Sequence, residues 1–528
     1  MRYVAALDVG TTTVRFHILN EKAITVASST EKINLIYPEP GFVEIDPDQL
    51  WGIIIKVIKD TLDHGGIDPK DIACVGISSQ RASFITWNIK SGKYYHKFIT
   101  WKDQRAATLV EEWNRSITMK GLRMGASILY TFTRKKRFLA GSVLKFMNMQ
   151  VTLKLVWALQ NIPNLREAAY NEEVAFGGVD CWLLYKLTGR HIMDVSSASA
   201  TGIFDPFTME WADWALNLLK LPRSIFPEVV DTAGNFGVTP ENIFGVEIPI
   251  CCSMADQAAS LFGSGCFKPG DLKITMGTGT FVNVNTGQQP HASVAGLYPV
   301  VGWRIGKELI YIAEGSSSDT GILIEWTKSI GLIDNISETS DAANSVNDTD
   351  GVYFVPAFSG LQAPINDYTA ATGFFGLKPT TRKEHIIRSL LESLVFRIQL
   401  LHECLCKETS FTYQRIKIDG GVSKNDFVMQ SLADSTGLEV ERPVSVEMSI
   451  LGVAFLAGLQ CGLWKNREEL LELRQTDRIF KPNEESRLSY QYALTQWKRV
   501  VERFKNCIKH LSCRLGHNSI LVENREYE

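Results

Sequence analysis

Two strand–turn–strand patterns built around Gly and Thr constrain the fold of this chain more than any other feature. The first runs from Tyr3 to Leu19, and its two apolar, β-branched strands are joined by a turn at Gly10 to Thr13. Roughly 270 residues later the pattern returns from Leu272 to Val284, with the turn at Gly277 to Thr280. A repeat at this spacing predicts a duplicated fold of two α/β lobes.

The stretches between the turns alternate between strand and helix patterns. Ile72 to Ile77 is a short apolar run typical of a buried strand, and Asp48 to Leu62 has apolar residues at helical spacing. His385 to Cys406 and Ser449 to Leu463 predict packed core helices. We therefore expect a lobe over residues 1–258, a second lobe over 259–465, and a charged, solvent-facing helical appendage over 466–528. We expect the stretch from 334 to 350 to be a polar loop.

Composition excludes several classes of protein. The 528 residues are 45% hydrophobic and carry a net charge of −3, so the chain is globular and has no overall charge that favours nucleic acid. Its 10 cysteines form no CxxC pair, and we expect reduced thiols. The amino terminus reaches Asp8 before an apolar signal segment could form, and no long apolar run follows, so we expect a cytoplasmic protein.

The Gly/Thr turns have the chemistry of a phosphate site. Closely spaced backbone N–H groups and hydroxyls donate to polyphosphates, although a simple hairpin turn has the same sequence. Asp8 ends an apolar strand directly before the first turn, where a carboxylate would be costly unless it served a ligand such as hydrated Mg²⁺. The glycine pair Gly420-Gly421 after another strand favours a nucleotide cleft between the lobes. The chain has neither a Walker motif nor GxGxxG.

Asp256 is the candidate general base. It follows an apolar segment that ends at Ala255 and precedes a helix of small residues, so it could accept a proton from an attacking hydroxyl. The alternative role, a cap of that helix, is compatible with catalysis.

These motifs together resemble those of the FGGY carbohydrate kinases, and among them the glycerol kinases, over nearly the whole chain. The residues that carry the resemblance are Leu7 to Arg15, Gly41 to Pro47, Ser79 to Arg81, Phe176 to Leu183, Ala255 to Gln257, Met276 to Thr280, Ser359 to Pro364 and Asp419 to Asn425. The resemblance implies two actin-like (ribonuclease H-like) lobes, and transfer of phosphate from Mg-ATP, held between them, to glycerol. The product would be sn-glycerol 3-phosphate.

The resemblance also implies roles for individual residues. It places the nucleotide phosphates against Thr11, Thr12, Thr13 and Arg15, and the rest of the ATP site at Thr278, Gly321, Gly421 and Asn425. The polyol would contact Arg81, Asp256 and Gln257. The expected partner is thus a small molecule, and the resemblance is compatible with a homodimer.

Three positions depart from the glycerol kinase pattern. Ala82 stands where the family has a glutamate that accepts hydrogen bonds from glycerol, and Met149 stands where a tyrosine flanks the polyol. Ala371 replaces an expected arginine. A kinase for another polyol or sugar, or a catalytically weak ATP-binding regulatory scaffold, therefore remains an alternative. An actin-like or chaperone-like ATPase would have no use for Asp256-Gln257.

One further segment, Thr131 to Leu139, carries the basic run Arg134-Lys135-Lys136-Arg137 between aromatic residues. Such a cluster is most often a solvated loop, and contact with anionic lipid is the alternative. We do not expect membrane contact from the sequence.

Overall fold

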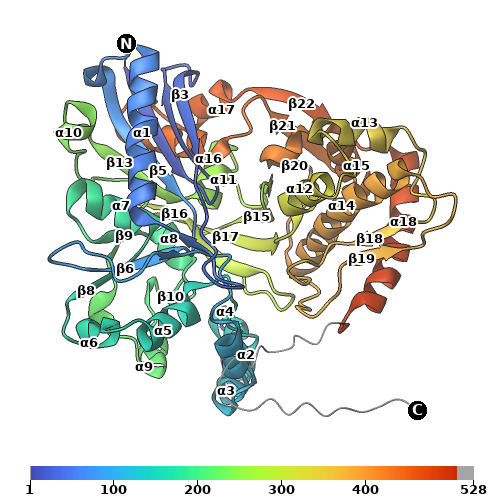
Figure 1. Ribbon diagram of the computed structural model, residues 1–528, viewed down its shortest axis with the longest axis horizontal. Coiled ribbons are helices and arrows are strands. Elements are labelled where there is room, and N and C mark those ends of the chain that lie inside the picture. Colours follow the sequence, from blue (N-terminus) through green and yellow to red (C-terminus); the bar gives the residue numbers. More distant parts are fainter. Residues whose placement is uncertain (1, 508–528) are drawn as a thin grey trace, which may run out of the picture.

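The structure is a computed structural model that describes residues 2–507, and its two main β-sheets define two lobes (Figure 1). The first sheet has five strands in the order β13-β5-β1-β2-β3, and the second has seven in the order β16-β17-β15-β14-β20-β21-β22. A four-stranded sheet, β4-β7-β6-β8, and helices complete the first lobe. The cleft expected between the lobes lies where the first strands of both main sheets end.

The elements of the first lobe are β1 (Tyr3–Val9), β2 (Thr13–Leu19), β3 (Thr25–Lys32), β4 (Glu44–Ile45), α1 (Pro47–Gly65), β5 (Ile72–Ser79), β6 (Phe84–Asn88), β7 (Phe98–Ile99), α2 (Ala107–Arg115), α3 (Ile117–Thr133), α4 (Lys136–Ser142), α5 (Val151–Asn161), α6 (Leu165–Tyr170), β8 (Val174–Gly178), α7 (Val179–Thr188), β9 (Ile192–Asp194), α8 (Val195–Ser199), β10 (Phe204–Asp205), β11 (Glu210–Trp211), α9 (Asp213–Leu219), β12 (Glu228–Val230), α10 (Glu241–Phe244), β13 (Ile250–Ala255) and α11 (Asp256–Gly263).

The elements that follow are β14 (Leu272–Met276), β15 (Thr280–Gly287), β16 (Tyr298–Ile305), β17 (Glu308–Ser317), α12 (Thr320–Ser329), α13 (Thr339–Asn344), β18 (Tyr353–Val355), β19 (Gly373–Phe375), α14 (Lys383–Glu408), β20 (Arg415–Asp419), α15 (Asp426–Thr436), β21 (Glu439–Pro443), α16 (Met448–Gln460), α17 (Arg467–Leu473), β22 (Thr476–Phe480) and α18 (Glu484–Phe504).

Five strands of the second sheet repeat the pairing pattern of the first, with β16 and β22 added at the edges, and this confirms the predicted duplication. In the first sheet β1 is antiparallel to β2, which is antiparallel to β3, and β1 is parallel to β5, which is parallel to β13. In the second, β14, β15 and β17 form the antiparallel meander, and β14, β20 and β21 run parallel. In both lobes the Gly/Thr turn joins the first two strands.

The helices begin and end where the sequence supplies caps. In α1, the Asp46 carboxylate accepts hydrogen bonds from the backbone N–H groups of Asp48 and Gln49, and Pro47 occupies the first turn. The helix ends at Gly66, whose φ of 57° lies in the left-handed region that glycine adopts without strain. Leu50 and other apolar residues at helical spacing face the sheet and are buried.

Helices α11 and α16 join the lobes through close backbone contact. A Cβ atom at Gly452 would lie 1.8 Å from the carbonyl oxygen of Ala259, and one at Gly263 would lie 2.3 Å from that of Met448. Both helices share an apolar core with β1 and with Trp303 of the second sheet. The predicted lobe boundary at 258/259 falls inside α11.

The solvent-facing appendage expected after residue 465 is wrong for the part that the structure describes. Strand β22 extends the second sheet beside β21, and α18 buries one apolar face against α14, α15 and β18. Trp497 is fully buried, and its indole N–H donates to the carbonyl of Phe354 at 2.7 Å. The prediction relied on the many charged residues of this stretch and overlooked the amphipathic pattern of α18. A helix with one apolar stripe can pack against the core even when its other sides are charged. Residues 508–528 lie outside the described residues.

Two predicted loops are also wrong in part. The stretch from 334 to 350 contains the short helix α13, whose Thr339 and Ala343 are buried. The segment from Thr131 to Leu139 spans the end of α3 and most of α4, which form a helical hairpin that projects from the first lobe (Figure 1). None of the helices in residues 2–507 has the length and apolar character needed to cross a membrane.

Candidate active site

Both Gly/Thr turns line one large cleft between the lobes, with a volume of about 3120 Å³. The other walls include the start of α11, the end of β20 and the start of α16. Most of the predicted site residues lie on these walls, namely Asp8, Thr11, Thr12, Thr13, Arg15, Arg81, Asp256, Gln257, Thr278 and Gly421. Gly321 and Asn425 are not among the residues that line the cleft.

The first turn offers an unsatisfied carboxylate beside free hydroxyls. Asp8 is buried at the end of β1, where its Oδ2 contacts Nη1 of Arg15 at 3.3 Å and its Oδ1 has no hydrogen-bond partner among the described residues. Burial raises the pKa of the Asp8 carboxyl above its usual value, and the positive charge of Arg15 opposes this. The Thr11 hydroxyl accepts a hydrogen bond from the Trp101 indole at 2.8 Å, while Thr12 is exposed.

Arg15 connects this turn to the C-terminal part of the chain. Its Nε lies 2.7 Å from the Glu447 carboxylate, directly before α16, while its Nη1 faces Asp8. Burial raises the pKa of Glu447, and Arg15 counteracts the rise. A guanidinium held between two carboxylates is fixed in place at the cleft wall.

The second turn is held by glycines that approach its backbone. Gly420 has a φ of 88°, and a Cβ atom there would lie 2.6 Å from the carbonyl of Met276. Gly321 donates its N–H to the Thr278 carbonyl at 2.9 Å, and a Cβ atom there would lie 2.8 Å from the carbonyl oxygen of Gly277. Gly321 therefore supports the turn from behind.

Gly421 begins a short 3-10 turn, Gly421–Lys424, and Asn425 follows it as the N-cap of α15. A Cβ atom at Gly421 would meet no atom within 4 Å, so its backbone is open to the cleft. Asn425 caps α15, where its side-chain oxygen accepts from the N–H of Val428 at 3.0 Å and its amide donates to Thr339. The structure thus gives Asn425 a capping position.

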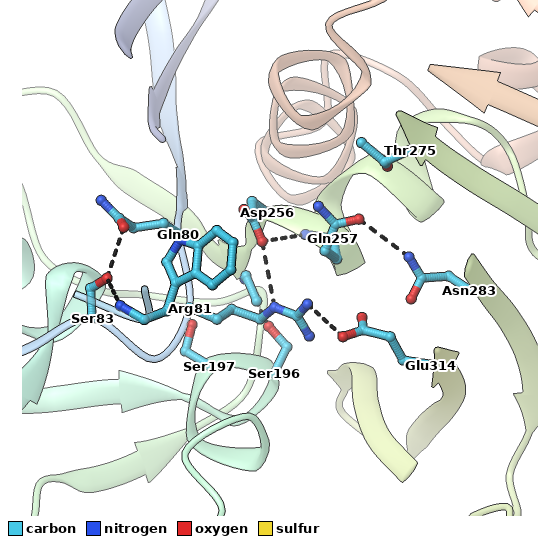
Figure 2. Close-up of polar contacts among 12 residues, drawn as sticks. Gln80, Arg81, Ser83, Ser196, Ser197, Asp256, Gln257, Thr275, Asn283 and Glu314 are labelled. Carbon is cyan, nitrogen blue, oxygen red and sulfur yellow. Dashed lines mark hydrogen bonds and ion pairs between the residues drawn. The ribbon is translucent and has the colours of Figure 1, made fainter. Parts of the chain in front are cut away.

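The three predicted polyol-site residues lie together, joined by a fourth (Figure 2). Arg81 contacts the Asp256 carboxylate at 3.5 Å through Nε and the Glu314 carboxylate at 2.7 Å through Nη2. Gln257 follows Asp256 on α11, and its side-chain oxygen accepts from the Asn283 amide at 3.3 Å. The loop after β5 and the start of α11 in the first lobe, and strands β15 and β17 in the second, therefore supply polar groups to one point of the cleft.

Asp256 is the first residue of α11, so its carboxylate faces the positive end of the helix, and it accepts the Gln257 N–H at 2.7 Å. Burial raises the pKa of this carboxyl to about 6, although Arg81 acts in the opposite direction. Nearby Asp8 and Glu314 add to the rise. A carboxyl with this pKa is largely ionised at neutral pH and gains a proton in mild acid.

Glu314 is a candidate site residue that the sequence did not predict. It lies in β17, is fully buried, and accepts a hydrogen bond from the Tyr298 hydroxyl at 2.7 Å as well as the ion pair with Arg81. Its Oε2 has no partner among the described residues. A carboxylate inside an apolar strand is the same signal that identified Asp8, and could have identified Glu314.

Two of the three departures from the glycerol kinase pattern, Ala82 and Met149, line the cleft. Ala82 has a φ of 56°, and its carbonyl accepts a hydrogen bond from the buried Lys154 ammonium at 3.3 Å. Ala371 is not among the cleft residues, and its N–H donates to the carbonyl of Phe504. The first two substitutions therefore change the cleft surface, and the third does not.

No group of three or more His, Cys, Asp or Glu side chains that could hold a metal occurs within the described residues. Asp8 nevertheless fits Mg²⁺, because its Oδ1 is a buried, unpartnered hard oxygen beside the first turn. Mg²⁺ usually takes one or two protein carboxylates and completes its shell with water and phosphate.

Comparison with known proteins agrees with this architecture. Residues 3–263 match the N-terminal domain of the FGGY family of carbohydrate kinases, and residues 272–461 match its C-terminal domain. Glycerol kinase 5 of Danio rerio is 48% identical, over 95% of this chain and 96% of its own length. Glycerol kinase 2 of Thermotoga maritima is 38% identical, over 95% and 99%.

Solved structures give the same result. The crystal structure of Plasmodium falciparum glycerol kinase with ADP is 26% identical, covers 96% of this chain and 98% of its own, and superposes with a TM-score of 0.84. Xylulose kinase from Lactobacillus acidophilus, at 22% identity, covers 95% and 98% with a TM-score of 0.81, and shares the fold. The predicted fold and the predicted class of sugar or polyol kinase are confirmed, and the chain belongs to the FGGY family of carbohydrate kinases.

Proposed function

We propose that this kinase transfers the γ-phosphoryl group of ATP to a terminal hydroxyl of glycerol and forms sn-glycerol 3-phosphate. The observation that carries the proposal is the cluster of Asp256, Arg81, Gln257 and Glu314, which lines the same cleft as both Gly/Thr turns. The relatives named glycerol kinase, which match nearly the whole chain, favour glycerol as the acceptor.

Asp256 would act as the general base. Its raised pKa matches the task, because a carboxyl with a pKa of about 6 is largely ionised at neutral pH and still a better base than an ordinary aspartate. Arg81 would hold this carboxylate in place and donate to polyol hydroxyls, and Gln257 would position the reacting end. The proton of the attacking hydroxyl would move to the Asp256 carboxylate as the new O–P bond forms and the bond from the γ-phosphorus to the bridging oxygen of ADP breaks, so that ADP leaves.

The two turns would hold the nucleotide from opposite lobes. Backbone N–H groups and hydroxyls of Thr11 to Thr13 would donate to the phosphates, and Arg15 would lend positive charge. Thr278 and Gly421 would approach from the second lobe, with Gly321 supporting the turn and Asn425 fixing the helix that follows. Asp8 would hold Mg²⁺ through water or directly, and the ion would neutralise phosphate charge during transfer.

Glu314 would supply part of the polyol recognition that is lost because position 82 is an alanine. Its free Oε2 is a hydrogen-bond acceptor next to Arg81, so a polyol hydroxyl could donate to it. A buried acceptor left without a partner costs about 1–3 kcal/mol, which substrate binding would recover. The pocket would therefore keep a carboxylate acceptor in spite of the alanine.

The direct test is an assay of ATP-dependent glycerol 3-phosphate formation with purified protein. Asp256→Asn keeps the shape of the site and removes the base, and we expect it to lower kcat by about 10²–10⁴-fold. The matched control is Asp213→Asn, because Asp213 also lies in the first turn of a helix but is exposed. Failure to form product above the Asp256→Asn background at saturating glycerol would overturn the proposal.

A second candidate is a kinase for another polyol or sugar, which Ala82 and Met149 favour because they make the cleft less polar and change its shape. A panel of polyols and sugars distinguishes it, since a larger kcat/KM for another acceptor would replace glycerol. The variant Ala82→Glu tests the same point, and a tenfold or greater fall in the KM for glycerol would show that recognition alone had weakened. A weak regulatory scaffold would bind ATP but gain no turnover from this change.

A further inference from the structure

The hairpin of α3 and α4 carries an exposed apolar face that the kinase site does not use. Ile117, Met124, Ile128 and Phe132 have 88%, 64%, 51% and 83% of their surfaces exposed. They are spaced seven, four and four residues apart, so they lie along one side of α3. None of the four lines the cleft. We refer to them as the apolar stripe.

The surroundings of the stripe are strongly basic. Residues 113–166 contain ten Lys and Arg and no Asp or Glu, in a chain whose net charge is −3. Arg134, Lys135 and Lys136, which we call the basic cluster, are exposed at the end of the hairpin, and none has a carboxylate at ion-pair distance among residues 2–507. Arg137, by contrast, pairs with Asp205 at 2.7 Å.

The side of α3 opposite the stripe packs in part, and Met119 is its one buried residue. Ser116 caps the helix by accepting the N–H of Met119 at 3.1 Å, and Met119 itself is buried. The hairpin closes through small residues, since a Cβ atom at Gly141 would lie 3.0 Å from that of Ala126. The hairpin therefore holds the stripe on a defined surface that points away from the packed side.

We propose that this hairpin docks the kinase on an anionic lipid surface, with the apolar stripe in the interface and the basic cluster against lipid phosphates. An exposed apolar face flanked by unpaired Lys and Arg is the arrangement by which amphipathic helices lie in the plane of a charged membrane. The helix would lie on the bilayer, because no described helix can cross it.

The positive charge of the hairpin favours an anionic lipid surface over a second copy of the chain or a nucleic acid. A symmetric contact through this hairpin would pair two copies of a segment, residues 113–166, that carries ten Lys and Arg and no Asp or Glu, so like charges would repel. A nucleic acid would satisfy the basic cluster, but it would leave the four apolar side chains in contact with phosphate or water. An anionic lipid surface, which is apolar beneath its charged headgroups, complements the stripe and the cluster together.

Docking would also orient the active-site cleft. Gly121, Leu122 and Leu129, on other sides of α3, line the cleft. One wall of the cleft would therefore stand next to the lipid surface, and the enzyme would work at the membrane rather than in bulk solution.

The test is sedimentation of the purified full-length chain with vesicles of phosphatidylcholine alone or with about one third phosphatidylserine, at low and high salt. We expect binding to the anionic vesicles only, and weaker binding as salt rises. Each basic residue at a charged bilayer contributes roughly fivefold to partitioning, so the triple variant Arg134→Gln, Lys135→Gln, Lys136→Gln should bind about 100-fold more weakly. A triple variant with Met124→Ser, Ile128→Ser and Phe132→Ser should also lose binding.

The matched control is the pair Leu488→Ser and Tyr492→Ser, two exposed apolar residues on α18 with 70% and 67% exposure. This variant should bind vesicles like the unmodified chain. All altered side chains are exposed, so thermal unfolding should change little in each variant. The proposal is overturned if the unmodified chain ignores anionic vesicles, if it binds neutral vesicles equally, or if the hairpin variants bind as well as the control.

Discussion

The pKa of Asp256 makes a quantitative prediction about the pH dependence of the kinase. A base with a pKa of about 6 is roughly 90% ionised at about pH 7 and roughly 10% ionised at about pH 5. The value of kcat/KM, which reports the free enzyme, should therefore fall about tenfold over this range.

The contacts of the Asp256 carboxylate determine the direction in which its pKa shifts. Burial favours the neutral acid, while the ion pair with Arg81 favours the ionised form. Removal of that charge, in Arg81→Met, should move the acidic limb to higher pH as well as weaken substrate binding. A variant at exposed Asp213 should leave the limb in place.

The assay should quantify product directly by chromatography, because coupling enzymes have their own pH dependence. The pH profile should be measured at saturating ATP and low acceptor concentration. Two results would refute the reasoning. One is a kcat/KM that stays constant from about pH 7.5 to about pH 5 while the protein remains folded. The other is an acidic limb that persists unchanged in Arg81→Met.

Three further predictions concern stability and the first turn. Gly452→Ala should destabilise the protein by about 1–3 kcal/mol or more, because its Cβ would overlap the Ala259 carbonyl. Gly52→Ala, in open space on α1, should stabilise it by about 0.5–1 kcal/mol. Thermal unfolding measures both changes, and equal effects of the two variants would contradict the close contact between α11 and α16. Trp497→Ala should lower the free energy of unfolding by about 3–5 kcal/mol, as measured by chemical denaturation. A negligible change would support a solvent-facing C-terminal segment instead. Asp8→Asn should lower kcat at least 100-fold. It should not lower the melting temperature near pH 7, because a carboxyl whose pKa is raised by burial destabilises the folded protein when it is ionised. A large drop in melting temperature would show that Asp8 has a structural role instead.

The membrane-docking proposal and the kinase proposal are independent of each other. The apolar stripe contains no residue of the cleft, so vesicle binding can succeed or fail whatever the acceptor proves to be. If both hold, the enzyme phosphorylates a small polyol at a lipid surface.

Local signals predicted most of the fold and the two carboxylates Asp8 and Asp256 of the candidate site. The strands around Gly10 and Gly277 were predictable because a run of apolar β-branched residues broken by Gly and Thr has few other structures. Asp8 and Asp256 were visible because a carboxylate next to an apolar strand is costly unless it has a use. Glu314 carried the same signal, but its role depends on contact with Arg81, which lies more than two hundred residues earlier.

The amino-acid sequence by itself determined that two similar α/β lobes form and that each presents a Gly/Thr turn, since periodicity and turn chemistry act over short distances. Only the tertiary structure decided how α18 is covered, how closely α11 and α16 pack, and that no segment within residues 2–507 covers the stripe on α3. An apolar stripe has the same sequence pattern whether it meets a sheet, a lipid surface or water. What it faces is set by the packing of distant segments, which no local pattern records.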